Sequence, residues 1–285
     1  MNDIANATGL DSLKTLKTTA RMPVLFLGHG SPMNAIEDNE YRRSWQTLGA
    51  EFGTRYPKPQ LILCISAHWL TRGHWLTGMA QPKTIHDFGG FPQALFDQQY
   101  PAPGAPEAAQ EISQALSQPG TPAPVGLDMA EWGLDHGSWG VLKPMFPVAD
   151  IPVVQLSMDY SRPASEHFVL GAQLRALRDN GVLIVGSGNL VHNLRAARFG
   201  AGSQKAYDWA VEFDSVLGGH IQTGDLASLQ DFQKLGEVAK LAHPTHEHYL
   251  PLLYAAGAVH DGESVRSFNA SFQAASISMR SAVWG

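Results

Sequence analysis

Residues 23–30 read PVLFLGHG, and residues 60–69 read QLILCISAHW. In both segments a continuous apolar run ends at a histidine, which is His29 in the first segment and His68 in the second. An apolar run that is continuous rather than alternating is typical of a strand buried on both faces of a sheet. The two segments therefore predict two buried strands that each present a histidine near the carboxyl end.

Two further apolar segments repeat this pattern, IPVVQLSM from Ile151 and GVLIVGSGNLVHN from Gly181, and the second of them ends near His192. A short strand is expected from Val125 to Leu127, and the alternating stretch SFQAASISMRSAV predicts an antiparallel strand on one edge of the sheet. The patterns between these strands predict helices over residues 39–54, 106–117, 165–180, 205–217 and 230–241, and one more after the polar turn at His243.

Strands that alternate with helices predict an α/β fold, with a central, mostly parallel or mixed β-sheet flanked by helices. The sequence has no repeat, no low-complexity tract and no linker that would divide the chain, so we expect a single domain over residues 22–285. Residues 1–21 lack the apolar core of a secretory signal. They are expected to form a poorly ordered extension or one short helix.

The composition limits the class of protein. The chain of 285 residues has a formal net charge of −6 and no run of Lys or Arg, which argues against a nucleic-acid-binding surface. Its single cysteine, Cys64, lies within an apolar run, so we expect a buried, inert thiol and no internal disulfide. No apolar stretch is as long as a membrane span. These features predict a cytoplasmic protein with neither a membrane nor a nucleic acid as partner.

The placement of three histidines predicts a site. Ligands of open α/β sheets bind past the carboxyl ends of the strands, and His29, His68 and His192 all follow predicted strands. Each histidine alone also fits a structural role, such as capping a turn, packing on Trp69 or bonding a nearby carbonyl. Their shared placement favours a metal or catalytic site, and an all-histidine site suits zinc or iron.

The segment HPTHEHY offers Glu247 and His248 as further ligands, although it is not the HExxH motif of a zinc protease helix. His136 has glycine beside it and could reach a substrate, whereas His86 and Asp87 either border the same crevice or only stabilise their loop. The remaining histidines are expected in a solvated helix start (His243 and His246) or on the surface (His74, His167, His220 and His260).

Other catalytic motifs are missing from the sequence. GHGSP and GSGNL do not match the GxSxG elbow of serine hydrolases, and the sequence has no Walker A loop. GSGNLV lacks the third glycine of a dinucleotide-binding fingerprint. These absences disfavour a serine hydrolase, an NTPase and a Rossmann dehydrogenase.

From about Met22 to the C-terminus the sequence resembles the bacterial 4,5-DOPA extradiol dioxygenases, in the superfamily of the catalytic LigB-type subunit of protocatechuate 4,5-dioxygenase. Six ordered motifs carry the resemblance: GHGSPM at His29, SAHW at His68, TIHDFGGFPQALF at His86, DHGSWGVL at His136, SGNLVHNL at His192 and EHYLPLLY at His248.

The resemblance implies one divalent metal ion per chain, Zn2+ or Fe2+. The implied metal residues are His29, His68, His192 and His248. His192 is also an implied acid/base catalyst, and His136 is implied near the substrate, where we also expect His86 and Asp87. Relatives of the protocatechuate type use two histidines and one glutamate; here Glu247 and His248 are both available, and the motif match favours His248.

The implied reaction is oxidative: a catechol such as DOPA chelates the metal, His192 takes a phenolic proton, and O2 opens the ring at the 4,5 position. The same histidines would also serve a zinc hydrolase, because zinc lowers the pKa of bound water to near 7. A third alternative is a non-catalytic zinc-binding protein, although structural zinc sites commonly include cysteine. The sequence leaves the oligomeric state open.

Overall fold

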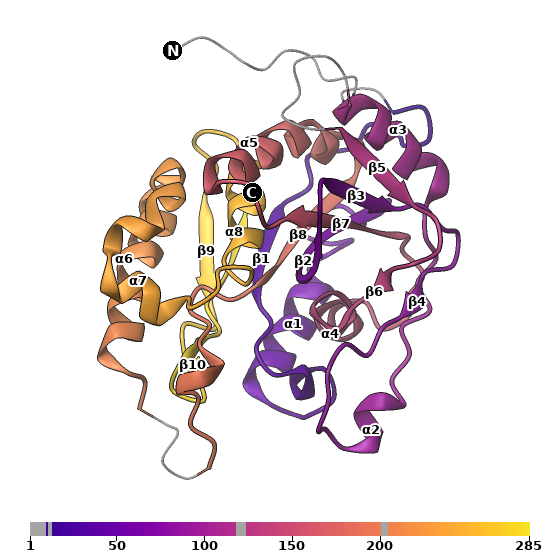
Figure 1. Ribbon diagram of the computed structural model, residues 1–285. Coiled ribbons are helices and arrows are strands. Elements are labelled where there is room, and N and C mark those ends of the chain that lie inside the picture. The colour runs from indigo at the N-terminus through magenta and orange to yellow at the C-terminus, as the bar shows by residue number, and fades with distance from the viewer. Residues whose placement is uncertain (1–9, 11–12, 118–123, 201–204) are drawn as a thin grey trace.

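The computed structural model describes residue 10 and residues 13–117, 124–200 and 205–285. Within these residues the main sheet has eight strands in the order β5-β3-β7-β2-β8-β1-β12-β9 (Figure 1). Its strands are β1 Val24–Gly28, β2 Leu61–Thr71, β3 His74–Thr77, β5 Val125–Asp128, β7 Val153–Asp159, β8 Val182–Gly188, β9 Val265–Phe268 and β12 Ser281–Trp284. Two small ladders pair β4 Lys83–Thr84 with β6 Gly133–Leu134, and β10 Phe272–Gln273 with β11 Ile277–Ser278.

The four central strands β7, β2, β8 and β1 are mutually parallel, and β12 joins β1 antiparallel. This mixed sheet confirms the predicted α/β class. The C-terminal strand β12 is antiparallel, as the sequence predicts. The prediction that it forms an edge of the sheet is wrong. Strand β9 pairs with β12 on its outer side and forms that edge.

The helices are α1 Glu40–Ala50, α2 Gln93–Phe96, α3 Pro106–Leu116, α4 His136–Met145, α5 Ala164–Leu174, α6 Asp208–Thr223, α7 Glu237–Ala242 and α8 Leu250–Gly257, with 3-10 segments at η2 Pro32–Ala35, η3 Arg175–Asn180, η4 Leu194–Ala196 and η5 Leu226–Leu235. The single helix expected over residues 230–241 is wrong. Gly236 has a φ of 63° and ψ of −123°, a conformation that only glycine adopts easily, and it separates η5 from α7.

The buried strands contribute side chains to two separate hydrophobic cores, one on each face of the sheet. Val24 and Phe26 of β1 belong to the core beneath α5, α6 and α8, whereas Leu25 and Leu27 belong to the core beneath α1 and α4. This alternation explains why the strand sequences are continuously apolar. Cys64 is fully buried in the second core, where burial raises the pKa of its thiol to about 12, so the prediction of an inert thiol is confirmed.

Helix α4 has no counterpart in the sequence prediction. Its glycines and the internal Pro144 weaken the helical pattern. The residue that could have indicated the start of this helix is Asp135. Its carboxylate accepts a hydrogen bond from the Ser138 amide and caps the first turn. Because α4 begins at His136, this cap also places that histidine at the carboxyl edge of the sheet.

The extension expected at residues 1–21 falls partly outside the described residues, which omit 1–9 and 11–12. Leu10 and Leu13 are buried in the same core as α5 and α8. Farther along, the Thr19 amide donates to the Asp179 carbonyl. In the part of the chain that the structure describes, no helix has the length and apolar character needed to cross a membrane.

Three histidines that the sequence predicts to be exposed are buried. His74 and His167 are buried rather than on the surface, and the His167 Nδ1 lies 2.8 Å from the Tyr254 hydroxyl. His243 is also buried rather than solvated, and its Nε2 lies 2.9 Å from the Leu190 carbonyl oxygen. Sequence periodicity misplaced them because each imidazole finds a polar partner on a distant segment, which offsets the cost of burial.

His167 is expected to make the protein less stable in acid. Burial lowers its folded-state pKa from 6.5 to about 4, so the unfolded state binds more protons between these values. The stabilising effect is present above pH 6.5 and is lost as the pH falls to 4, with a magnitude of about 3 kcal/mol. Urea denaturation should show that His167→Gln loses less unfolding free energy than the wild type between pH 7 and pH 4.

The matched control for this experiment is His220→Gln, because His220 lies on α6 and is partly exposed beside Asp225. This variant removes a histidine without removing a buried imidazole, so its loss of unfolding free energy between pH 7 and pH 4 should be larger than that of His167→Gln. An equal pH dependence in His167→Gln and the wild type would show that His167 does not contribute to it.

Candidate metal centre

Five histidines meet at the carboxyl edge of the central strands. His29 directly follows β1, and His68 lies within β2, where the pairing with β7 shifts register between Ile65 and Leu70. Such irregularities redirect side chains and are frequent beside active sites. His192 follows the end of β8, His248 precedes α8, and His136 is the first residue of α4.

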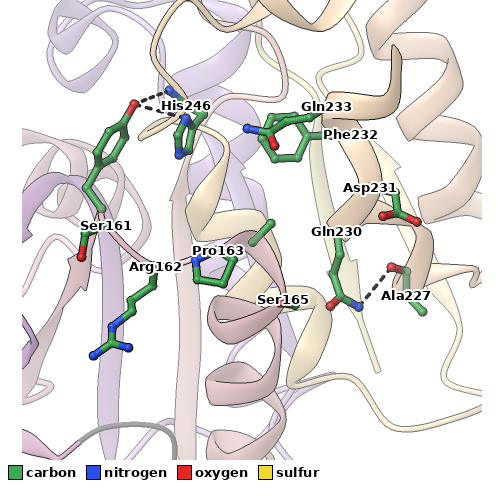
Figure 2. A pocket seen from close by; sticks show the side chains of 12 residues that line it. Ser161, Arg162, Pro163, Ser165, Ala227, Gln230, Asp231, Phe232, Gln233 and His246 are labelled. Carbon is green, nitrogen blue, oxygen red and sulfur yellow. Dashed lines mark hydrogen bonds between the residues drawn. The ribbon is translucent and has the colours of Figure 1, made fainter. Parts of the chain in front are cut away.

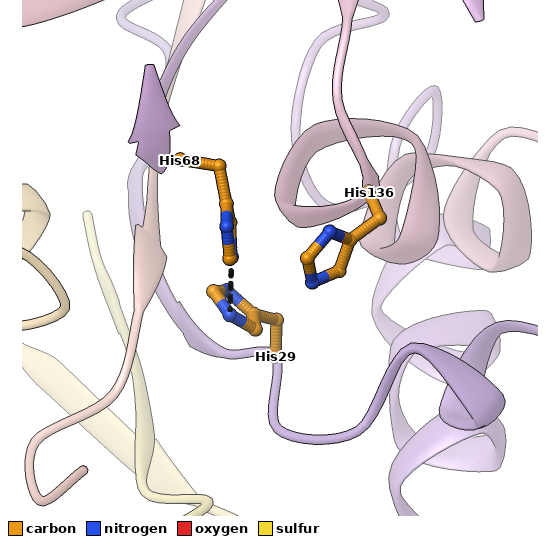
Figure 3. Close-up of side chains that lie close together, drawn as sticks. All are labelled: His29, His68 and His136. Carbon is orange, nitrogen blue, oxygen red and sulfur yellow. Dashed lines mark hydrogen bonds between the residues drawn. The ribbon is translucent and has the colours of Figure 1, made fainter. Parts of the chain in front are cut away.

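His29, His68 and His136 form the first group of possible ligands (Figure 3). One ligand atom from each lies within 4.8 Å of the others. The Nε2 atoms of His29 and His68 are 3.3 Å apart, and the ring centroids of His68 and His136 are 3.9 Å apart. The structure therefore brings together two of the three histidines that the sequence places at strand ends, His29 and His68, and adds His136 to them.

Hydrogen bonds fix which nitrogen of His29 is free. The Ser187 hydroxyl donates its one hydrogen to the Gly137 carbonyl at 2.5 Å, so it can only accept from the His29 Nδ1, which lies 3.0 Å away. A neutral His29 that carries its proton on Nδ1 has a free lone pair on Nε2. That lone pair faces His68.

The spacing between the two Nε2 atoms suits a metal ion. The Nδ1 of His68 lies 3.3 Å from an Asp87 carboxylate oxygen, which favours a proton on that nitrogen and leaves Nε2 free as well. Without an ion the two Nε2 atoms are within hydrogen-bond distance, and one ring can donate its Nε2 hydrogen to the other (Figure 3); an ion bound by both nitrogens would replace that hydrogen bond. Imidazole nitrogens that share a tetrahedral ion at roughly 2.1 Å lie about 3.4 Å apart, close to the observed 3.3 Å.

His192, Glu247 and His248 form a second group within 4.8 Å of one another. The rings of His192 and His248 stack at a centroid distance of 3.4 Å, and the His248 Nδ1 lies 3.2 Å from a Glu247 oxygen. The His248 ring centroid is 5.3 Å from that of His29 and 5.1 Å from that of His68. The four residues implied as ligands are thus neighbours, divided between two adjacent groups, and the first group also contains His136.

Burial keeps these rings neutral. It is the largest cause that lowers the pKa of His29, His68 and His248 well below 6.5, and repulsion among the histidines adds to it. Burial also lowers the pKa of His192 to about 3. Neutral imidazole is the form that binds a metal or accepts a proton, so the cluster is prepared for both at neutral pH.

Glycines allow the surrounding segments to approach closely. A Cβ at Gly188 would collide with the His248 carbonyl oxygen, and a Cβ at Gly137 would collide with the Ser66 hydroxyl and the His68 ring. The GSG motif at the end of β8 therefore brings the loop before α8 against the strand, and Gly137 brings α4 against β2.

Of the residues that the sequence places near a substrate, Asp87 and His136 lie together, whereas His86 points elsewhere. Asp87 lies against His136, at 3.0 Å from its Nδ1, as well as against His68. His86 instead has its Nε2 2.9 Å from the Gln98 carbonyl oxygen and its ring beside Phe88 and Trp139. That contact agrees with the alternative that His86 stabilises its loop. A role of His86 toward a substrate stays a prediction.

Sequence reasoning missed two polar residues that support the cluster. Ser187 is the hydroxyl that orients His29, and Asp135 is a fully buried carboxylate that accepts from Ser66 at 2.7 Å and from Gln155. Burial raises the pKa of Asp135, and the hydrogen bonds from Ser66 and Gln155 reduce this rise without cancelling it. The helix-cap position of Asp135 is a detectable signal, whereas a serine within an apolar strand gives none.

A separate hollow of about 580 Å3 lies between the loop after β7 and η5 (Figure 2). Tyr160 and His246 line one part of this hollow. The Tyr160 hydroxyl lies 3.2 Å from the His246 Nδ1, and the two rings stack with their centroids 4.4 Å apart. None of the residues that line this hollow belongs to the two histidine groups. His246 is half-buried there rather than fully solvated as expected.

Fold and site together define an α/β enzyme whose neutral histidines gather at the carboxyl edge of the sheet in an arrangement that suits a divalent metal. A family model described as the catalytic LigB subunit of aromatic ring-opening dioxygenase matches residues 23–282. The chain belongs to this family, and it is an oxidoreductase of the extradiol ring-cleaving type.

Known relatives agree with this assignment. The 4,5-DOPA dioxygenase extradiol of Escherichia coli K12 is 51% identical over 85% of this chain and 87% of its own length. The 4,5-DOPA dioxygenase extradiol of Beta vulgaris is 38% identical over 82% of this chain and 85% of its own length. A crystal structure of an uncharacterized Escherichia coli K12 protein matches with a TM-score of 0.78 and 44% identity, covering 93% of this chain and all of that one.

Proposed function

We propose that the protein opens the ring of a catechol such as DOPA, at the 4,5 position and with O2. The observation that carries this proposal is the pair of Nε2 atoms on His29 and His68, which face each other at 3.3 Å in the same cluster as the neutral His192. The names of the relatives support DOPA as the substrate. The proposal includes one divalent metal ion per chain, Zn2+ or Fe2+, of which Fe2+ suits the oxygen chemistry.

The metal residues in this proposal are His29, His68, His192 and His248, with Glu247 beside them. A bound ferrous ion would supply the oxygen activation that protein side chains cannot perform. His192 has the additional role of base: its neutral ring accepts a phenolic proton as the catechol binds. Its near-parallel stacking on His248 supports this double assignment, because it keeps the ring next to the ligands.

The substrate residues are His136, with His86 and Asp87 on the neighbouring loop. Phe88 supports an aromatic substrate, since its ring lies edge-on to His136 at a centroid distance of 5.5 Å. Aromatic rings favour such edge-to-face contacts. The partners are then a small catechol and O2. A cytoplasmic location also stays a prediction, which fractionation of cells would test.

His136→Ala is expected to weaken catechol binding while the metal stays bound. The loss should be roughly tenfold, the effect of losing one hydrogen bond of ordinary strength. Calorimetric titration with a catechol and metal analysis of the same sample provide the measurement, with His220→Ala as the control. Unchanged affinity and turnover for every catechol tested would remove His136 from the substrate site, and loss of the metal would make it a ligand.

The function itself is tested by oxygen uptake on anaerobically purified protein that is loaded with Fe2+ or with Zn2+. Stoichiometric O2 consumption with DOPA in the Fe2+ form alone is the expected result. The competing function is a zinc hydrolase that uses the same histidines, and the tetrahedral spacing of His29 and His68 is compatible with it. Ester hydrolysis by the Zn2+ form, without O2 uptake by the Fe2+ form, would replace the first proposal by the second.

A further inference from the structure

The C-terminal segment of residues 276–278 lies along the loop that carries His192, and its middle residue Ile277 forms an antiparallel bridge with that histidine. We propose that this segment is a strap that positions the His192 ring, and that Asp214 of α6 anchors the strap. This inference rests on the role of His192 proposed above and assigns a role in the reaction to residues outside the two histidine groups.

Hydrogen bonds between the strap and the loop flank His192 on both sides. Before it, the Ser278 amide donates to the Val191 carbonyl at 2.9 Å. After it, the Asn193 amide donates to the Ser276 carbonyl at 3.1 Å, and the Ser276 hydroxyl donates to the Asn193 carbonyl at 2.8 Å. The strap therefore fixes the backbone that carries the His192 ring.

A buried polar network connects the strap with α6. Ser278 is fully buried, and its hydroxyl donates to the Asp214 carboxylate at 2.6 Å and accepts the Arg280 amide at 3.2 Å. The Arg280 guanidinium donates to the same carboxylate, from Nε at 3.0 Å and from Nη2 at 2.6 Å. Asp214 thus holds the strap at one residue within it and at another just beyond its end.

The strap is also connected with His248, whose ring stacks on His192 at a centroid distance of 3.4 Å. The connection is Asn189, which is fully buried. Its side-chain amide donates to the Ser278 carbonyl at 2.9 Å, and its backbone amide donates to the His248 carbonyl at 2.8 Å. Ser278 is therefore linked by hydrogen bonds to the backbone on both sides of the stacked pair.

The ion pair of Asp214 and Arg280 is shielded from solvent, with side chains that are 6% and 19% exposed. A buried pair of this kind adds little to the free energy of folding, because the cost of removing both charges from water offsets most of their attraction. Separation of the two charges is nevertheless strongly disfavoured, so the pair holds a defined geometry. That geometry matters at His192, since a displacement of about 1 Å near a reacting group can lower the rate by about a hundredfold.

Ser278→Ala tests the link, because it removes the hydroxyl and leaves Asp214 paired with Arg280. Turnover of DOPA by the Fe2+-loaded variant is expected to fall by roughly tenfold, part of the effect that a misplaced group can have. In the His192→Gln background the same change should have little further effect, because the ring that it displaces is already missing. A general loss of stability would lower turnover in both backgrounds.

Hydrogen exchange of the metal-free protein, resolved by residue, gives a readout that does not depend on activity. The Ser278 and Asn193 amides donate across the contact between strap and loop, so they should exchange roughly tenfold faster in Ser278→Ala. This increase should exceed any change at the amides of β1, which report the stability of the whole sheet. Asp214→Asn keeps the shape of the anchor but weakens its bonds to Arg280, and it should have the same effects.

Ser157→Ala is the matched control, since Ser157 is a fully buried serine of β7 whose hydroxyl also has two hydrogen-bond partners, the Thr71 hydroxyl and the Trp75 amide. It should leave turnover unchanged and should not loosen the Ser278 and Asn193 amides relative to those of β1.

An equal loss of turnover on Ser278→Ala in the wild-type and His192→Gln backgrounds would overturn the proposal. Wild-type exchange of the Ser278 and Asn193 amides in both Ser278→Ala and Asp214→Asn would overturn it as well. Full activity of His192→Gln at native metal content would refute the role of His192 on which the inference rests. The exchange data separate this failure from the others, because they show directly whether the strap holds the loop.

Discussion

Replacement of His29 or His68 by alanine is expected to abolish stoichiometric metal binding and to leave the fold largely intact. His29 follows β1 and His68 lies near the carboxyl end of β2, and neither side chain belongs to one of the two hydrophobic cores. Its loss therefore removes a ligand without opening a core. The loss of affinity should exceed the roughly 10- to 100-fold effect of removing an outer partner of a ligand. Metal content after dialysis, measured beside circular dichroism, provides the test.

His220→Ala is the control, because this histidine lies on α6 and pairs with Asp225 rather than with the cluster. It should bind metal as the wild type does. Normal metal occupancy in both His29→Ala and His68→Ala would refute the assignment of the site. A collapsed circular dichroism spectrum would refute the expectation that the fold does not depend on these side chains.

His192→Gln is expected to lower turnover by roughly a hundredfold or more, the usual contribution of general acid–base catalysis. Glutamine has a similar reach and keeps an acceptor, but it cannot take up a proton near neutral pH. If His192 acts mainly as a base, the variant keeps its metal and still binds catechol. Single-turnover kinetics with the metal-loaded variant measure the effect on the chemical step.

A metal titration of the same variant separates the two roles of His192. If the residue acts mainly as a ligand, metal affinity falls first and an excess of metal restores part of the activity. His246→Gln is the control, because His246 is a nearby half-buried histidine whose ring stacks on Tyr160. Full activity of His192→Gln at native metal content would exclude both roles.

The sequence alone was sufficient for the four central strands β1, β2, β7 and β8 and for the histidines near the ends of three of them, but it did not predict β3 or β9. Runs such as LILCIS are buried on both faces, so their pattern depends on composition and on little else. Helix α4 was missed because its stability depends on tertiary packing of Trp139 and Leu142 beneath the sheet and on the Asp135 cap. Local propensity is weak in a segment that contains two glycines and a proline.

The sequence by itself determined that histidines would line the carboxyl edge of an α/β sheet, because strand order and strand direction place the ends of buried strands together. Only the tertiary structure decided which nitrogen of each ring is free. Ser187 orients His29 across 158 positions of the chain, and Asp87 lies against His68 and His136 from a separate loop. Such contacts depend on distances between folded segments, to which no local pattern of residues corresponds.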